Sequence, residues 1–454
     1  MLKQLIPTGY CLKCNICCRF GQKNSVYAPK FLPREASCLG GTSFYLNKLK
    51  QYKTSTLNND IFICEFFLPS TNTCSIYEKR PLDCQLYPFM LTYDKTYENI
   101  ILVADTKCPY IKDAIQLEEY VKHLVEFLKE QNLPHNFIMP YQEDTIMMAV
   151  LKNLNGFKAL ALEHKNIFDG YLNAGALSTR SFVNVYVWSD LFNILWKIID
   201  NNLCIFYEYK NEFNMLLPPI SPYKELSKEV VKKCIKLLKP ASRIENISKG
   251  EIKILKDCGL KIYKNTDEYI YLAKDLAELK GNKFASHRAS VNQFIKNQKY
   301  TYRRFDILDA DECLDLYSKW AEQKKQKSSD SVYQQLLEDN FTAHKKAMLN
   351  YEALGLIGRV VEIDGKIRAY TFGFELNDVG AKQCSVPTYC VLFETADTAI
   401  KGLAQYIYKI FAQELVGLKA EFINAMDDSG MENLRKVKLS YHPYKILSSY
   451  IGVL

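Results

Sequence analysis

The chain has 454 residues, of which 48% are hydrophobic and 24% charged, and its 59 basic and 51 acidic side chains give a net charge of +8. These values exclude collagen-like, low-complexity and mainly disordered chains, and the length suits about three domains, each with its own hydrophobic core. The lysines are scattered, so we read most of the charge as solvated surface, with a basic patch for tRNA, nucleotide phosphates or anionic lipid as the alternative.

The longest apolar stretches, such as residues 191–207, are interrupted by polar side chains. None of them offers the roughly 20 apolar residues that a membrane-spanning helix needs. The opening residues, MLKQLIPTGYC, lack the apolar core of a secretion signal. We therefore expect a cytoplasmic, bacterial-type protein without a transmembrane segment.

Cysteines concentrate near the start of the sequence, where nine of the fifteen lie between Cys11 and Cys108. Four of them form the run C-L-K-C-N-I-C-C, and a C-x-x-C spacing lets two thiolates of one turn bind the same soft cation. Eight are predicted to be metal ligands: Cys11, Cys14, Cys17, Cys18, Cys64, Cys74, Cys84 and Cys108. They could saturate two tetrahedral sites, or an iron–sulfur cluster plus a structural metal, and thiolates suit zinc and iron equally well. Cys38 is left out of this set, and Cys204, Cys234, Cys258, Cys313, Cys384 and Cys390 are expected not to bind metal.

The run and the motifs that follow it resemble the YkgJ-type cysteine-cluster family, which is described as zinc- or iron-chelating. The family pattern continues with a cysteine before an apolar pair, then C-x-I-Y-x-x-R-P-x-x-C-x-x-Y-P and a final Cys-Pro. The sequence supplies these elements between Cys64 and Pro109. The resemblance implies metal binding by the first quarter of the chain.

Residues 115–131 have helical periodicity, with Leu117, Val121 and Leu124 on one face, and are expected to close a cysteine domain that spans residues 1–131. The following residues, 132–150, contain two prolines and are predicted to be a linker. From Thr145 onward, helical patterns alternate with short β-branched and aromatic runs. The predicted strands include 203–207, 260–263, 357–363, 367–374 and 391–393.

The clearest hairpin signal lies in residues 357–374, where V-V-E-I and K-I-R-A-Y-T-F flank Asp364-Gly365. Asp-Gly supplies the positive φ angles that a tight hairpin turn requires. A further strand ends at Phe393, and a helical pattern opens at Gly402. Hairpin, strand, loop and helix is the order of an acetyltransferase-like (GNAT) core, in which the helix N-terminus faces a phosphate.

From about Asn166 onward the sequence resembles the family of the phosphatidylglycerol lysyltransferase C-terminal domain. This family consists of two GNAT-like modules in tandem and transfers an aminoacyl group from aminoacyl-tRNA. The resemblance is carried by S-T-R-S-F-V-N-V-Y-V-W at 178–188, L-K-G-N-K-F-A-S-H-R-A-S-V-N-Q-F at 279–294, F-E-T-A-D at 393–397 and N-A-M-D-D-S-G-M-E-N-L-R-K-V-K-L-S-Y-H-P at 424–443. Together, the two resemblances imply an α+β fold in which a small, metal-bound cysteine-cluster domain precedes two GNAT-like mixed-sheet modules, at 151–270 and 271–454.

Two departures from the family patterns bear on the substrates. Membrane-bound lysyltransferases carry a multi-helix N-terminal region where this chain has a cysteine domain, which counts against a lipid acceptor. The acyl-CoA pyrophosphate loop reads Gln/Arg-x-x-Gly-x-Gly/Ala, and here Ala399 occupies the first position before Gly402 and Ala404. This substitution weakens the acyl-CoA alternative.

Four residues are candidates for catalysis: Glu394, Asp397, Asn424 and Asp428. Glu394 and Asp397 follow an apolar strand, where a carboxylate could hold an ammonium group or accept a proton from an amine. The structural alternative is a solvated strand end or a helix cap. Asn424 and Asp428 belong to a segment that ends at Gly430 and either presents polar groups to a cleft or forms a plain turn.

Six residues are candidates for binding substrate or cofactor: Arg288, Asn292, Gly402, Arg435, Lys438 and Tyr441. Arg288 and Asn292 lie at i and i+4 of one predicted helix face. Arg435 and Lys438 lie one turn apart and could clamp a phosphate, whereas the alternative is a basic helix face in water.

These features predict transfer of an acyl or aminoacyl group from an activated donor, aminoacyl-tRNA or acyl-CoA. The acceptor would be an amine or hydroxyl of a small molecule, peptide or lipid, and the N-terminal domain would hold zinc, iron or an iron–sulfur cluster. The alternative is a non-enzymatic metal-binding or redox-sensing protein in which the GNAT-like fold binds a ligand.

Overall fold

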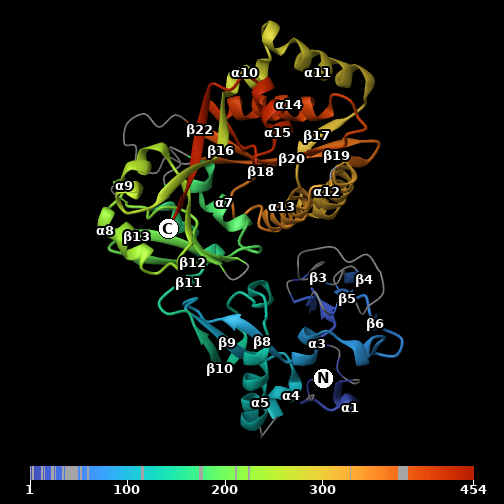
Figure 1. Ribbon diagram of the computed structural model, residues 1–454. Helices are drawn as coiled ribbons and strands as arrows, with labels where there is room; N and C mark the ends of the chain where they lie inside the picture. Colours follow the sequence, from blue (N-terminus) through green and yellow to red (C-terminus); the bar gives the residue numbers. More distant parts are fainter. Residues whose placement is uncertain are drawn as a thin grey trace. The chain divides into compact units, whose positions relative to one another are not determined.

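The computed structural model describes the chain apart from residues 1, 3–4, 12–13, 15, 22–24, 26, 33–34, 36–49, 52–53, 59–60, 114–116, 173–176, 210–211, 223–224, 328 and 377–386. Cys38 and Cys384 thus lie outside the described residues. The chain divides into two compact units, Met1–Ala159 and Leu160–Leu454 (Figure 1). Within the described residues, no helix combines the length and the apolar character needed to cross a membrane.

The first part of Met1–Ala159 consists of short elements that bring the cysteines together. The helices are α1 (Thr8–Cys11) and α3 (Leu82–Leu86), and the strands are β1 (Arg19–Phe20), β2 (Lys30–Phe31), β3 (Lys50–Gln51), β4 (Thr54–Asn58), β5 (Ile61–Cys64), β6 (Phe67–Leu68) and β7 (Thr73–Cys74). β5 lies between β1 and β4, β2 pairs with β3, and β6 pairs with β7. Strands this short have little stability of their own, so we expect other interactions to hold this part together.

The second part of this unit is an antiparallel sheet of β8 (Phe89–Tyr93), β9 (Asn99–Asp105) and β10 (Thr145–Asn153), with β9 in the middle. Its core packs against α4 (Pro109–Asp113) and α5 (Leu117–Glu130). The helix expected at 115–131 is confirmed, with Val121 and Leu124 buried. The predicted linker differs from the structure, because residues from Thr145 onward pair with β9 and complete this sheet.

The second unit, Leu160–Leu454, is built on one large mixed sheet, which confirms the predicted α+β class. Its strands follow the spatial order β12 (Asn193–Ile199), β13 (Asn202–Tyr209), β14 (Glu212–Met215), β15 (Arg243–Ile247), β22 (Lys445–Val453), β16 (Lys261–Leu272), β21 (Phe422–Asp427), β20 (Thr388–Ala396), β19 (Lys366–Leu376), β18 (Ile357–Ile363) and β17 (Thr301–Arg304). The helices are α6 (Lys165–Asp169), α7 (Phe182–Val187), α8 (Lys228–Ile235), α9 (Ile252–Asp257), α10 (Ala273–Glu278), α11 (Ala285–Asn297), α12 (Ala310–Lys325), α13 (Ser331–Leu349), α14 (Leu403–Gly417) and α15 (Glu432–Ser440).

The two halves of this sheet repeat one arrangement. In the first half, antiparallel strands lead to β14, and α8 then connects β14 to the parallel strand β15. In the second half, antiparallel strands lead to β20, and α14 connects β20 to the parallel strand β21. The repeat is the tandem GNAT-like organisation that the family resemblance implies. β22 pairs with both β15 and β16 and makes the two halves continuous.

Helices cover both faces of the second half of the sheet (Figure 1). α12 and α13 pack on one face in a core that includes Tyr370 and Phe372, whereas α10, α11 and α14 pack on the other in a core that includes Ala369 and Val391. The hairpin expected around Asp364-Gly365 is confirmed: β18 and β19 pair through this turn, and both turn residues have positive φ angles.

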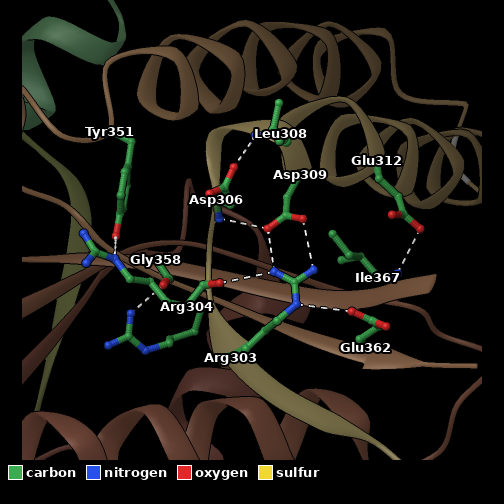
Figure 2. Close-up of polar contacts among 11 residues, drawn as sticks. Arg303, Arg304, Asp306, Leu308, Asp309, Glu312, Tyr351, Gly358, Glu362 and Ile367 are labelled. Atoms are coloured by element: carbon green, nitrogen blue, oxygen red, sulfur yellow. Dashed lines mark hydrogen bonds and ion pairs between the residues drawn. The ribbon is translucent and has the colours of Figure 1, made fainter. Parts of the chain in front are cut away.

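Ionic contacts join the start of α12 to the outer edge of this sheet (Figure 2). Arg303 of β17 donates from Nη1 and Nη2 to the two oxygens of Asp309, at 2.8 and 3.0 Å, and from Nε to Glu362 of β18, at 3.2 Å. The backbone N–H of Ile367 in β19 donates to Glu312 of α12, at 2.9 Å. These contacts hold α12 over three neighbouring strands.

Candidate functional site

All eight cysteines that the sequence singles out line one cavity of about 780 Å³ in the first unit. Cys11 ends α1, Cys64 ends β5, Cys74 ends β7, Cys84 lies within α3 and Cys108 directly precedes α4. The remaining thiols, those of Cys14, Cys17 and Cys18, come from the loop between α1 and β1. Residues almost 100 positions apart therefore face the same space.

Backbone and amide hydrogen bonds hold the cysteine run beside the later motifs. The N–H of Cys14 donates to the carbonyl of Cys11, at 3.0 Å, which forms the tight turn expected of C-x-x-C. The side-chain amide of Asn72 donates to the carbonyl of Cys14, at 3.0 Å. The N–H of Cys64 donates to the carbonyl of Cys18, at 3.1 Å. The run is thus fixed at one point to the β6–β7 turn and at another to the end of β5.

Two carboxylates fix the helix that carries Cys84. Glu35 accepts the N–H of Leu82, at the start of α3, at 2.8 Å. The neighbouring side chain of Asp83 accepts the N–H of Lys30, at 2.8 Å. An acceptor at the first turn satisfies N–H groups that have no partner within the helix, so a helix of five residues becomes tenable here.

The thiols raise one another's pKa. Burial, together with the neighbouring thiols of Cys17, Cys108 and Cys14, raises the pKa of Cys11 to about 11. Burial likewise raises the pKa of Cys64 to about 11, with Cys74 as an additional cause. At neutral pH these groups are therefore protonated in the absence of a cation. A soft metal cation would reverse the preference, because thiolates are its favoured ligands.

This donor set fits a zinc or iron site, since eight soft thiols face one space and repel one another when ionised. The Sγ atoms of Cys17 and Cys18 lie 4.0 Å apart. Among the described residues, no three His, Cys, Asp or Glu side chains stand close enough together to hold an ion as they are placed. Binding at about 2.3 Å per ligand would therefore draw the thiolates inward, and metal binding and folding would be coupled.

A second site lies in Leu160–Leu454, where β20 and β21 separate. These parallel strands pair through Thr388, Tyr389 and Cys390, and the pairing stops at Cys390 opposite Asn424, although β20 continues to Ala396. Each strand beyond this point keeps a neighbour on its other side, β19 for β20 and β16 for β21. Side chains from α14 and α15 meet the polar groups of both strands here.

Glu268 of β16 joins two of the sequence motifs in the interior. Its carboxylate accepts the backbone N–H of Ser178, at 2.8 and 3.1 Å, and the Ser178 hydroxyl, at 2.8 Å. It also accepts the side-chain amide of Asn424, at 2.7 Å. Both Glu268 and Asn424 are almost fully buried, at 2% and 1% exposure. Burial raises the pKa of Glu268, whereas these hydrogen bonds lower it.

Lys438 and Glu394 lie next to this junction. The ammonium group of Lys438 donates to the carbonyls of Ala425 and Met426 at the end of β21. Glu394 of β20 is partly buried, and its Oε2 atom is fully buried with no hydrogen-bond partner among the described residues. Burial raises the pKa of Glu394 to about 8, although the charge of Lys438 lowers it. A carboxyl group that ionises near neutral pH is suited to proton transfer.

Aromatic rings surround this pair. The ring of Tyr441 stacks on His287, with centroids 4.0 Å apart, and meets the ring of Tyr408 edge-on, at 5.0 Å. The hydroxyl of Tyr271 donates to the backbone carbonyl of Lys438, at 2.8 Å. Burial raises the pKa of Tyr408 well above its usual value, and Glu394 raises it further. The site is therefore a low-dielectric environment for the side chains of Glu394 and Lys438.

The structure brings together five of the predicted residues: Glu394, Asn424, Asp428, Lys438 and Tyr441. Among these, Asp428 is held by hydrogen bonds within the protein. Its carboxylate accepts hydrogen bonds from the hydroxyl of Tyr269, at 2.6 Å, and from the N–H of Gly430, at 3.0 Å. Arg435 lies on the same helix as Lys438 but is exposed to solvent.

The other predicted residues have local partners or lie at the surface. Asp397 accepts the N–H of Ala399 and a guanidinium N–H of Arg368, each at 3.0 Å, as in a turn cap. Arg288 donates to the backbone carbonyls of Leu279, at 2.5 Å, and Gly281, at 3.0 Å. Asn292 is exposed.

Gly402 permits the close approach of two helices. Its φ angle is +84°, and a Cβ at this position would lie 2.1 Å from the backbone oxygen of Ser290 in α11. Glycine is required here for both reasons, since a side chain would meet backbone and the conformation is left-handed. The start of α14 is consequently packed against a carbonyl group of α11.

Glu268, Ser178 and Tyr408 are not among the residues predicted for the site. The sequence does contain a signal for Glu268. This residue lies two positions before Ile270, on the same side of a strand whose last residues are apolar. An acid in such a position is either a solvated strand end or a buried group with dedicated partners. The partners of Glu268 lie 90 and 156 residues away, so the sequence does not reveal them.

Comparisons with known families agree with this architecture. Residues 174–452 match the family described as "Phosphatidylglycerol lysyltransferase, C-terminal", and residues 10–109 match the family described as "Putative zinc- or iron-chelating domain". No curated protein matches the chain.

The solved structures to which the chain is similar cover about two thirds of it. A conserved protein of unknown function from Bacteroides thetaiotaomicron VPI-5482 is 28% identical, with a TM-score of 0.57, over 66% of this chain and 99% of its own. The C-terminal domain of a lysylphosphatidylglycerol synthetase from Agrobacterium fabrum is 13% identical, with a TM-score of 0.45, over 64% of this chain and 90% of its own. L-PGS from Bacillus licheniformis is 15% identical, with a TM-score of 0.46, over 65% of this chain and 92% of its own.

The lysyltransferase match spans more than half of the chain and contains Glu268, Glu394, Asn424 and Lys438. The cysteine match contains the C-x-x-C-x-x-C-C run. The chain therefore belongs to the family of the phosphatidylglycerol lysyltransferase C-terminal domain, here joined to a cysteine-cluster domain.

Proposed function

We propose that the second unit transfers an aminoacyl group from aminoacyl-tRNA to an amine or hydroxyl acceptor, and that the first unit binds zinc or iron through its cysteines. Family membership supports aminoacyl or acyl transfer in general. The observation that carries the proposal is the Glu394 carboxyl group at the divergence of β20 and β21, with one oxygen buried and unpartnered and a pKa raised to about 8 by burial.

Attack of an amine or hydroxyl on an aminoacyl ester requires that the nucleophile lose a proton and that the leaving oxygen gain one. In the proposed mechanism, Glu394 accepts the proton when ionised and returns it to the leaving oxygen. A pKa close to the working pH suits both steps. Between pH 6 and 8 the ionised fraction of Glu394 rises, so the rate should rise with pH if this group is the base.

Lys438 is proposed to stabilise negative charge on the substrate. Its ammonium group has three N–H bonds, and the carbonyls of Ala425 and Met426 accept two of them. The remaining N–H can donate to the oxygen on which charge develops during acyl transfer. A fixed donor in a poorly solvated site contributes most when charge appears in the transition state.

The packing of Gly402 favours aminoacyl-tRNA over acyl-CoA as the donor. In acyl-CoA transferases the N–H groups at this helix start face a pyrophosphate. Here the carbonyl oxygen of Ser290 lies against Gly402, and its partial negative charge disfavours a phosphate at the same place. The absence of Gln or Arg at Ala399 supports the same preference.

A transfer assay on the full chain tests this function. The chain is incubated with lysyl-tRNA and other radiolabelled aminoacyl-tRNAs, or with acetyl-CoA, in the presence of amine, peptide and lipid acceptors. We expect transfer from an aminoacyl-tRNA, abolished in Glu394→Gln and retained in Glu375→Gln, whose side chain is exposed on the neighbouring strand β19. Transfer from acetyl-CoA alone would reverse the donor assignment, and unchanged activity in Glu394→Gln would remove this residue from the mechanism.

A further inference from the structure

The cysteine cavity is much larger than one metal ion needs, and its eight thiols are not equivalent. A single tetrathiolate ion accepts four ligands at about 2.3 Å. Eight thiols therefore exceed its capacity twofold, while the cavity measures about 780 Å³. The packing around the thiols shows how they divide.

One group of cysteines belongs to the core of the β8–β9–β10 sheet. Cys108 is buried in that core, and Cys11 packs against it. Cys14 is tied to Cys11 by its backbone hydrogen bond. Cys17, Cys108 and Cys14 are electrostatic neighbours of Cys11, and Cys17 is also a neighbour of Cys64, Cys74 and Cys84, so Cys17 lies between the two groups. Cys17 is assigned to the first group because the adjacent Cys18 packs against the other core.

The other group belongs to a separate small core. Cys64 is buried there together with Phe20, and Cys18 packs against it. The backbone N–H of Cys64 donates to Cys18. Cys74 is an electrostatic neighbour of Cys64, and both are neighbours of Cys84.

We propose that the cysteines form two adjacent four-thiolate metal sites, one of Cys11, Cys14, Cys17 and Cys108 and the other of Cys18, Cys64, Cys74 and Cys84. The inference rests on the proposal that the first unit binds metal. The two sites meet at the Cys17–Cys18 peptide, where the Sγ atoms lie 4.0 Å apart. Each site is assembled on its own hydrophobic core, so one can fill while the other is disabled.

Cobalt(II) is a suitable probe, because a tetrathiolate Co²⁺ site has intense visible and near-ultraviolet absorption. The full chain is purified anaerobically, stripped of metal and titrated with Co²⁺. We expect two equivalents in the wild type and one in both Cys108→Ser and Cys74→Ser. Cys258→Ser is the matched control, since Cys258 lies in the second unit, and it should retain two equivalents.

Alkylation and mass spectrometry identify the cysteines that remain bound in each variant, and circular dichroism reports its folding. In Co²⁺-loaded Cys108→Ser, we expect protection of Cys18, Cys64, Cys74 and Cys84, with Cys11, Cys14 and Cys17 modified. In Cys74→Ser the pattern should be inverted.

The possible failures are distinguishable. A wild-type chain that binds no Co²⁺ would contradict metal binding itself. One equivalent in the wild type, or loss of all metal from both folded variants, would contradict the two-site division while leaving metal binding intact. Protection of a mixed set of cysteines in either variant would overturn the assignment. If both variants fail to fold, partial loading of the wild type decides, because a molecule that holds one Co²⁺ must have one complete set of four cysteines protected.

Discussion

The two units satisfy their polar groups in opposite ways. In Leu160–Leu454, the buried carboxylate of Glu268 is fully engaged by Ser178 and Asn424, and Glu394 stands out because one of its oxygens is not. In Met1–Ala159, by contrast, a whole set of thiols faces a cavity with neighbours that raise their pKa. Protein atoms therefore preorganise the second site, whereas in the metal site proposed for the first unit a bound cation would complete the arrangement.

Metal removal should give the largest difference between the units. We expect chelation of the anaerobically purified chain to abolish the melting transition of the cysteine-rich part of Met1–Ala159, because its short strands and helices have little stability of their own and metal binding would contribute to folding. The transition of Leu160–Leu454 should keep its midpoint. Differential scanning calorimetry before and after chelation measures both, and re-addition of zinc or iron should restore the first. An unchanged thermogram would show that this unit does not depend on metal.

Gly402→Ala should destabilise the second unit by about 2–5 kcal/mol. A left-handed alanine costs about 1–2 kcal/mol, and overpacking against the Ser290 carbonyl adds roughly 1–3 kcal/mol. Gly430→Ala is the matched control, since Gly430 also has a positive φ angle, +69°, but a Cβ there meets no atom within 4 Å. Urea unfolding of both variants isolates the packing contribution. Equal destabilisation would mean that α11 shifts away from the added methyl group with little change in the free energy of unfolding.

Glu268→Gln should cost roughly 1–3 kcal/mol, because the amide NH₂ replaces one acceptor oxygen and leaves a buried donor facing another donor. Glu375→Gln, on an exposed strand position, should change the free energy of unfolding by less than about 0.5 kcal/mol. Chemical denaturation at pH 7 compares the two. If Glu268→Gln matches its control, the carboxylate is not the element that joins the two motifs.

Glu394→Gln should have little effect on stability near pH 5, and an effect that grows as the pH rises. Glu394 ionises near pH 4.5 when unfolded and near pH 8 when folded, so between these values the folded chain holds one more proton. The stability of the wild type relative to the variant should therefore fall as pH rises, by about 1.4 kcal/mol per pH unit at most, and level off above about pH 8. Melting curves from pH 5 to 9 test this. Parallel curves would show that Glu394 is not buried in its protonated form.

The sequence predicted those features that depend on neighbouring residues. Asp364-Gly365 predicted its hairpin because the turn conformation is a local property, and the C-x-x-C spacing predicted that Cys11 and Cys14 face one space. The role of Glu268 depends on partners from distant segments, which a single sequence does not show. Arg288 illustrates the same limit. It donates to the backbone carbonyl of Leu279, and Leu279 ends α10 in a left-handed conformation that the sequence does not reveal.

The position of β22 has a consequence for biosynthesis. This strand lies between β15 and β16, yet it follows every other strand of the unit along the chain. During translation, β15 therefore emerges about 200 residues before the strand that completes its edge, and the pairing has high contact order. The nascent first module exposes an unpaired strand edge during this interval, a state prone to aggregation and to recognition by chaperones.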